Sequence, residues 1–345
     1  MNSSNLNDLS KNKVLIVGGA GFIGHNLSLI LKELNYDVYL VDSLAVNNLY
    51  SIYKSSDNIK FPELAKEIIS ERLKLINNNN IEIAIEDARN YHAISHIVDK
   101  IKPDYLIHLA AVSHANKSNK NPHETFDHSL RTLENVLDSI KNSKCHLIYL
   151  SSSMVYGNFK SPQVDENSEC DPIGIYGALK LSGEKIIKAY NQVFGLKYTI
   201  VRPSALYGER CISRRVGQIF IESALNNDEI FIDGDGSDQL DFTYIRDFIE
   251  GIVKIIENKN SENQIFNITY GQSRSISDLI DILKKDFPKI QVKNKERDKL
   301  MPKRGTLSIN KAKELLNYNP SWPIEKGYPK YIKWYRDFFK NRFNR

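Results

Sequence analysis

A glycine-rich turn between an apolar run and a helical pattern constrains this chain more than any other feature. The run 14–17 is Val-Leu-Ile-Val, which is typical of a buried strand, and residues 18–24 are Gly-Gly-Ala-Gly-Phe-Ile-Gly. Gly18 permits a tight turn, Gly21 lets the backbone approach a pyrophosphate, and Gly24 lets the helix pack closely on the strand. The free amides at the start of the following helix, 23–34, would face the phosphates. The segment therefore predicts a dinucleotide-binding turn.

An acidic residue supports this interpretation. Asp42 directly follows the second apolar run, 38–41, and lies 18 residues after Gly24. A carboxylate at that place can accept hydrogen bonds from the adenosine ribose hydroxyls and would repel a 2′-phosphate. The sequence therefore favours NAD over NADP as the cofactor.

Short apolar runs alternate with helix-length segments along the first two thirds of the chain. This alternation is typical of buried parallel strands joined by βαβ crossovers, and it predicts an α/β fold with a doubly wound parallel (Rossmann) sheet. The predicted strands are 14–17, 38–41, 81–85, 105–109, 146–150 and 198–202.

The same alternation divides the chain. We expect a flexible tail at 1–12, an NAD-binding domain at 13–202 with a return at about 242–270, and a smaller C-terminal substrate-binding lobe at 203–241 and 271–345. The lobe segments are expected to be loop-rich with short helices, since prolines recur in them. The long stretch 45–80 contains a predicted helix, 62–75, and we expect it to form an excursion near the ligand mouth.

Composition excludes several classes of protein. The 345 residues are 41% hydrophobic and 26% charged with a net charge of +5, as in a soluble globular protein. The basic excess lies in 284–304 and 326–345, and we interpret it as solvated surface rather than a nucleic-acid site. No apolar run reaches the roughly 18 residues of a membrane span. The three cysteines form no CxxC pair, so we expect no metal site and a cytoplasmic location.

A tyrosine and a lysine four residues apart open another helical pattern, in the segment Tyr-Gly-Ala-Leu-Lys at 176–180. The spacing puts Tyr176 and Lys180 on one helix face. A free tyrosine has a pKa of about 10, but a nearby ammonium and an oxidised nicotinamide stabilise the phenolate, so Tyr176 could remove a proton from a substrate hydroxyl. Serines 151–153 follow the predicted strand 146–150, and a hydroxyl at that sheet edge can hydrogen-bond the reacting oxygen.

At this point the chain resembles the extended short-chain dehydrogenase/reductases, specifically the nucleotide-sugar epimerases and dehydratases, from Val14 to about Trp322. The resemblance implies Ser152, Tyr176 and Lys180 as catalytic residues, NAD as cofactor and a nucleotide-diphosphate sugar as substrate. It implies that the cofactor is bound by Gly18, Gly21, Phe22, Ile23, Gly24, Asp42, Asp87, Ala88, Leu109, Ala110, Ala111, Tyr176, Lys180 and Arg202. The expected substrate-binding residues are Ser153, Met154, Ala205, Arg214, Arg215 and Arg304.

Departures from the family pattern narrow the expected chemistry. The 4,6-dehydratases of the family carry a glutamate two residues before the motif tyrosine, and the fucose-nucleotide epimerase/reductases carry a cysteine. Met154 stands there in this chain and cannot exchange a proton, so we expect no dehydratase activity. Ala205 replaces a frequent asparagine and Leu240 a usual arginine. Arg214 and Arg215 could supply the missing charge.

Two enzymatic functions stay open from these residues. The first is an NAD-dependent nucleotide-sugar epimerase that passes through a transient keto sugar, with carbon 4 favoured by analogy with the family. The alternative is a nucleotide-sugar 4-dehydrogenase or ketoreductase, for example on a GDP-linked hexose or heptose, because both need the same side chains. A non-catalytic NAD-binding sensor is a remote alternative, since it would be expected to lose part of the catalytic set.

The resemblance also implies a homodimer or higher homo-oligomer. The family forms a four-helix interface from two helices, which correspond here to 124–141 and 176–190. The apolar residues expected on this face include Phe126, Leu130, Leu133 and Val136.

Overall fold

The computed structural model describes residues 12–54, 61–112, 115–213 and 215–343. The tail expected at 1–12 lies outside the described residues except for Asn12, and so does Arg214. None of the helices in these described ranges is long and apolar enough to cross a membrane.

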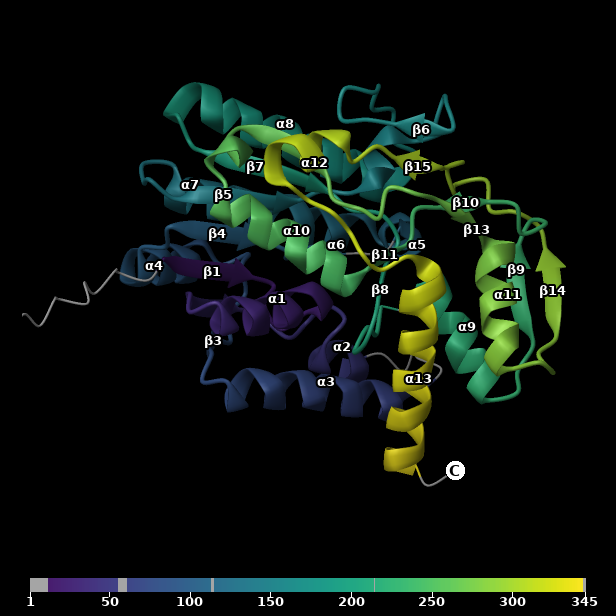
Figure 1. Ribbon diagram of the computed structural model, residues 1–345. Coiled ribbons are helices and arrows are strands. Elements are labelled where there is room, and N and C mark those ends of the chain that lie inside the picture. The colour runs from purple at the N-terminus through teal and green to yellow at the C-terminus, as the bar shows by residue number, and fades with distance from the viewer. Residues whose placement is uncertain (1–11, 55–60, 113–114, 214, 344–345) are drawn as a thin grey trace, which may run out of the picture.

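Within the described residues, seven strands form one parallel sheet in the order β12-β7-β5-β4-β1-β2-β3 (Figure 1). The chain runs outward from the central β1 in both directions, so the predicted doubly wound sheet is confirmed. The strands are β1 (Lys13–Val17), β2 (Asp37–Val41), β3 (Glu82–Ala84), β4 (Tyr105–His108), β5 (His146–Leu150), β7 (Tyr198–Arg202) and β12 (Gln264–Asn267).

Helices cover both faces of the sheet because alternate residues of each strand point to opposite sides. Val14 and Ile16 face a core shared with α1 (Phe22–Glu33) and α10 (Ile245–Glu257). Leu15 and Val17 face a second core shared with three other helices. These helices are α4 (Tyr91–Ile101), α7 (Thr132–Ile140) and α8 (Gly174–Phe194).

The excursion between β2 and β3 forms α2 (Leu49–Lys54) and α3 (Pro62–Asn78). Helix α3 packs against α1, as Figure 1 shows, and its apolar residues join the core on that side. Pro62 opens α3 in the first-turn position where a missing N–H costs nothing.

A smaller lobe continues beyond the carboxyl ends of the strands, on the right in Figure 1. It contains α9 (Val216–Leu225), α11 (Ile276–Asp286) and the parallel pair of β9 (Ile230–Asp233) and β14 (Val292–Lys295). Three other two-stranded pairs join it to the main domain: β6 (Gln163–Val164) with β15 (Thr306–Leu307), β8 (Leu206–Tyr207) with β11 (Thr243–Tyr244), and β10 (Gln239–Leu240) with β13 (Arg274–Ser275).

The C-terminal region corrects one expectation. The segment expected to be loop-rich with short helices contains the 20-residue α13 (Ile324–Phe343), with Pro329 inside it. Proline inside a helix removes a backbone hydrogen bond. Tyr328, Tyr331 and Tyr335 are fully buried along one face of α13. The free energy gained by burying these rings outweighs the low helix propensity of the proline.

The expected oligomer face also needs correction. Leu133 and Val136 on α7 are fully buried within the single chain, where they pack under the sheet, so they are unavailable to a partner. Phe126 is 49% exposed.

The remaining short elements are α5 (Ala115–Lys120), α6 (Pro122–Phe126), a π-helical turn (Asp127–Arg131), 3₁₀ turns at Ser153–Tyr156 and Lys259–Ser261, and α12 (Asn310–Leu316).

Candidate active site

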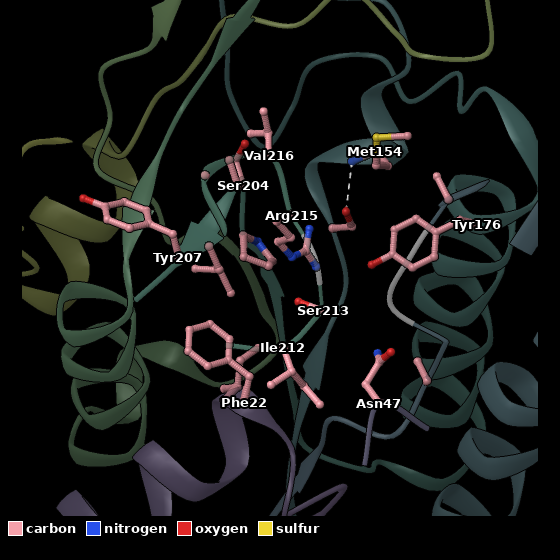
Figure 2. Close-up of a pocket in the computed structure, with 18 of the residues that line it drawn as sticks. Phe22, Asn47, Met154, Tyr176, Ser204, Tyr207, Ile212, Ser213, Arg215 and Val216 are labelled. Atoms are coloured by element: carbon pink, nitrogen blue, oxygen red, sulfur yellow. Dashed lines mark hydrogen bonds between the residues drawn. The ribbon is translucent and has the colours of Figure 1, made fainter. Parts of the chain in front are cut away.

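A cavity of about 880 Å³ opens where β1, β2, β4 and β5 end, between the sheet and the smaller lobe. Figure 2 shows residues from both parts around it: Met154 and Tyr176 on one side, Tyr207 and Val216 on the other. Except for Arg202 and the undescribed Arg214, all the site residues expected from the sequence line this cavity. Ligand clefts in open α/β sheets lie at this edge.

The glycine turn has the geometry that a pyrophosphate requires. Gly18 has a φ of +88°, and a Cβ there would lie 2.8 Å from the Ala110 nitrogen, so only glycine fits between the two strand ends. A Cβ on Gly24 would lie 2.5 Å from the Gly19 carbonyl oxygen. Helix α1 begins after Gly21 with no side-chain cap and no acid in its first turn. Its first amides are therefore left for an anionic ligand.

Asp42 lies beside this turn. Its carboxylate accepts hydrogen bonds from the Ala20 amide at 2.9 Å and the Leu44 amide at 2.8 Å, which fix its orientation. Burial raises the pKa of Asp42, and the two amides partly counteract this.

A second carboxylate, Asp87, lies at another place on the cavity wall and is held by Arg89, whose Nη2 lies 2.7 Å away. Burial favours a higher pKa for Asp87, but the hydrogen bonds from Arg89 outweigh it and lower the pKa. Asp87 is therefore a carboxylate at neutral pH.

The three expected catalytic residues face one another across the end of β5. The Ser152 side chain accepts a hydrogen bond from the Met154 amide at 3.2 Å, drawn in Figure 2, and it lies close enough to Tyr176 to influence the pKa of the phenol. Helix α8 begins at Gly174, earlier than the sequence predicted, so Tyr176 stands in its first turn. Burial raises the pKa of Tyr176, while Arg215 and the Ser152 hydroxyl oppose this increase.

Lys180 lies one turn further along α8. Its ammonium donates to the Leu150 carbonyl at 2.6 Å and lies 5.0 Å from the centre of the Tyr149 ring. Burial lowers the pKa of Lys180 to about 8, although Glu184 opposes this effect. Lys180 is therefore a buried cation next to Tyr176 that releases its proton unusually easily.

The substrate side of the cavity combines apolar groups with two cations. Met154 and Ala205 present no ionisable group, and Met154 is buried. Arg304 is half-buried, and its Nε atom is buried with no hydrogen-bond partner among the described residues. Burial and the nearby Arg215 lower the pKa of Arg304 to about 10. Two cations held this close in a cavity favour an anionic ligand such as a diphosphate.

Arg202 was expected to bind the cofactor, and the structure places it elsewhere. It is not among the described residues that line the cavity. Its Nε and Nη2 donate to the carboxylate of Glu184 at 2.9 and 2.7 Å, and its Nη1 donates to the Tyr156 hydroxyl at 2.9 Å. These bonds orient the guanidinium into the buried interior behind the cavity.

Sequence reasoning missed other residues of the cavity, above all Asn47, Asn116 and Arg72. Arg72 is one of the buried residues of α3, whose other members are Leu64, Ala65, Ile68, Ile69 and Ile76. The sequence did contain a signal for Arg72, because a single charged residue on the otherwise apolar face of a predicted helix indicates a buried functional group. Asn47 and Asn116 lie in polar segments that give no such signal.

Comparison with known proteins identifies the family. The profile of the NAD-dependent epimerase/dehydratase family matches residues 14–269. The chain is 30% identical over 331 residues to a putative UDP-glucose 4-epimerase of Methanocaldococcus jannaschii, covering 94% of this chain and 98% of that protein.

Two solved structures share the fold and cover 94% of this chain and 99% of their own. They are UDP-glucuronic acid 4-epimerase from Bacillus cereus in complex with UDP-glucuronic acid and NAD (28% identity, TM-score 0.84) and UDP-glucose 4-epimerase from Thermotoga maritima with UDP-glucose (27%, 0.81). The chain belongs to the NAD-dependent epimerase/dehydratase family.

Proposed function

We propose that this protein is an NAD-dependent nucleotide-sugar 4-epimerase. The observation that carries the proposal is the placement of Ser152, Tyr176 and Lys180 on one wall of a cavity that also contains the glycine turn and Asp42. The glycine turn and Asp42 fit a dinucleotide, which when bound would take up hydride from the sugar carbon and return it.

The side chains of this chain have separate tasks in that reaction. Tyr176 accepts the proton of the sugar hydroxyl as carbon 4 is oxidised, and Ser152 donates a hydrogen bond to the same oxygen. Arg215 and Ser152 favour the phenolate form of Tyr176, as their opposition to the raised pKa indicates. Lys180 adds a buried positive charge one helical turn away.

The relatives support the position of the reaction and the class of substrate. Those compared above are named as 4-epimerases of UDP-glucose or UDP-glucuronic acid. Arg215 and Arg304 would bind the substrate diphosphate, and we propose a UDP-linked sugar on this basis.

The test is interconversion of UDP-glucose or UDP-glucuronic acid with the 4-epimer, with NADH absorbance followed in the same sample. An epimerase interconverts the two diastereomers while the absorbance stays low. Tyr176→Phe should lower turnover by a factor of about 10²–10⁴. Net accumulation of NADH would indicate a dehydrogenase, and equal turnover by Tyr176→Phe would overturn the proposal.

Asp42 supports a preference for NAD(H). Asp42→Ala should narrow the ratio of the dissociation constants for NADP⁺ and NAD⁺, because it removes the charge that repels a 2′-phosphate. A wild-type protein that prefers NADP⁺ would contradict this part of the proposal.

We also propose that the protein is a homodimer in the cytoplasm. The exposed Phe126 lies just before the π-helical turn that leads into α7, and Phe194 is exposed at the end of α8. The three cysteines are free, as in a reducing compartment. Light scattering at micromolar concentration should give the mass of a dimer, and Phe126→Asp should lower it. A wild-type monomer would exclude the interface.

A further inference from the structure

The excursion helix α3 places a buried arginine in the wall of the cavity. Arg72 is 1% exposed, and it is one of the cavity-lining residues. Its Nε donates to the Arg210 carbonyl at 2.9 Å, and its Nη2 donates to the same oxygen. Its Nη1 is buried and has no hydrogen-bond partner among the described residues.

The charge of Arg72 also has no ion-pair partner, although the Asp42 carboxylate is close enough to favour the cation at longer range. No carboxylate lies within ion-pair distance of it in the part of the chain that the structure describes. Burial lowers its pKa to about 10, so the guanidinium is still cationic at neutral pH. A buried cation with an orphan N–H is costly, and an anionic ligand in the cavity would satisfy both its charge and its donor.

The surroundings of Arg72 locate it at the cofactor end of the cavity. Helix α3 packs on α1, whose first turn contains His25, and His25 Nδ1 lies 2.9 Å from the Gly21 carbonyl oxygen. Burial and the charge of Arg72 together lower the pKa of His25, so Arg72 lies close to this turn.

The opposite side of Arg72 is formed by the loop that follows β8. Arg210 Nε lies 3.0 Å from His25 Nε2, and its Nη1 lies 3.3 Å from the Glu71 carboxylate. Ile212 of the same loop packs against α3, and Figure 2 shows it at the same end of the cavity as Phe22, the first residue of α1. The Arg72 side chain therefore extends from α3 between this loop and the glycine turn.

We propose that Arg72 binds the pyrophosphate of the dinucleotide, opposite the amides of the glycine turn. This inference rests on the proposed use of NAD. A guanidinium suits this task because its planar N–H groups match phosphate oxygens. The 2′-phosphate of NADP is disfavoured as the partner because the Asp42 carboxylate lies nearby and would repel it. The excursion thus has a role: it delivers a positive charge that the glycine turn lacks.

The test measures binding to the full-length protein by calorimetry, with NAD⁺, ADP-ribose, NADP⁺ and adenosine as ligands. Arg72→Met should weaken the binding of NAD⁺ and of ADP-ribose equally, by about 10- to 100-fold, because the variant loses a hydrogen bond to a charged group. Adenosine, which has no phosphate, should keep its dissociation constant. Arg72→Lys retains the charge but loses the planar donors, so its affinity for NAD⁺ and ADP-ribose should lie between those of wild type and Arg72→Met.

Lys74→Met is the matched control, since it removes an exposed cation from the same helix and should leave all four ligands unaffected. If Arg72→Met does not fold, Arg72→Lys and Arg72→Gln replace it in the same binding measurements. The inference would be overturned if Arg72→Met bound NAD⁺ and ADP-ribose with wild-type affinity. It would also be overturned if the variant lost as much affinity for adenosine as for NAD⁺, or lost affinity for NADP⁺ alone. A wild-type protein that binds no NAD⁺ would instead refute the proposed function.

Discussion

Glu184 and Arg202 form a buried bidentate ion pair directly behind the candidate active site, with Nε and Nη2 of Arg202 at 2.9 and 2.7 Å from the two carboxylate oxygens. The same carboxylate accepts the Ser151 hydroxyl at 2.5 Å. The pair therefore connects α8, β7 and the end of β5, the elements that carry or flank the catalytic residues.

This pair predicts a specific pattern of stabilities. Glu184→Met alone should lower the free energy of unfolding by about 3–5 kcal/mol, because it leaves the Arg202 charge buried without a partner. Arg202→Met alone should have a similar effect. The double variant should lose less than the sum of the two, since it buries neither charge, and urea unfolding of all four proteins measures this coupling. Strictly additive losses would show that the pair contributes no coupling.

Lys180 predicts a pH dependence. Its pKa is about 8 in the folded chain against 10.5 for an ordinary lysine. Between these values the unfolded chain holds a proton that the folded chain has released, so this group makes the free energy of unfolding rise with pH from about 8 to 10.5. Below pH 8 both states are protonated and its contribution is constant.

The measurement compares wild type with Lys180→Met by urea unfolding from pH 6 to 10.5. The stability of wild type relative to the variant should be constant up to about pH 8 and then rise. Lys185→Met removes an exposed lysine from the same helix and corrects for the loss of a charge. A constant difference across the whole range would show that Lys180 titrates as an ordinary lysine.

Two glycines with similar backbone angles allow a matched comparison. Gly18 and Gly195 have φ values of +88° and +70°, but a Cβ on Gly195 would meet nothing within 4 Å. Gly195→Ala should therefore cost only the backbone strain, about 1–2 kcal/mol. Gly18→Ala adds a clash with the Ala110 backbone, so it should lower the melting temperature further.

Binding of NAD⁺ separates the two glycine variants more sharply. The clash at Gly18 displaces the turn that faces the pyrophosphate, so Gly18→Ala should lose measurable binding in a calorimetric titration, whereas Gly195→Ala should keep the wild-type dissociation constant. Wild-type affinity in Gly18→Ala would contradict the role of this turn.

The sequence predicted the sheet well because its strands are buried on both faces and therefore consist of continuous apolar runs. The predicted bounds of β5 and β7 match the structure, and those of the other four predicted strands differ by one residue at one or both ends. The glycine turn and the helical Tyr176–Lys180 pair were also predictable, because local spacing alone determines their geometry.

Features that depend on long-range packing could not be predicted in this way. Arg202 stands at a strand end in a family motif, but its orientation follows from Glu184, which lies on a different element. The cavity position of Arg72 depends on how α3 packs against α1. Pro329 indicates a break in local terms, whereas tertiary burial of tyrosines keeps α13 continuous.

Met154 carries the last prediction, which concerns the reaction itself. It is buried at the start of the 3₁₀ turn that follows β5, and Figure 2 shows it beside Tyr176. Its thioether can neither donate nor accept a proton at carbon 5 or 6, whereas Ser152 and Tyr176 are placed to act on one hydroxyl.

With UDP-glucose in heavy water, the enzyme should therefore yield the 4-epimer with no deuterium at carbons 5 and 6 and no 6-deoxy-4-keto product, as NMR and mass spectrometry would show. Deuterium enters carbon 5 only if some group removes and replaces that proton. Ser152→Ala is the matched variant: it should slow epimerisation and still give unlabelled carbon 5. Label at carbon 5 in the wild-type product would mean that another residue of the cavity moves the proton.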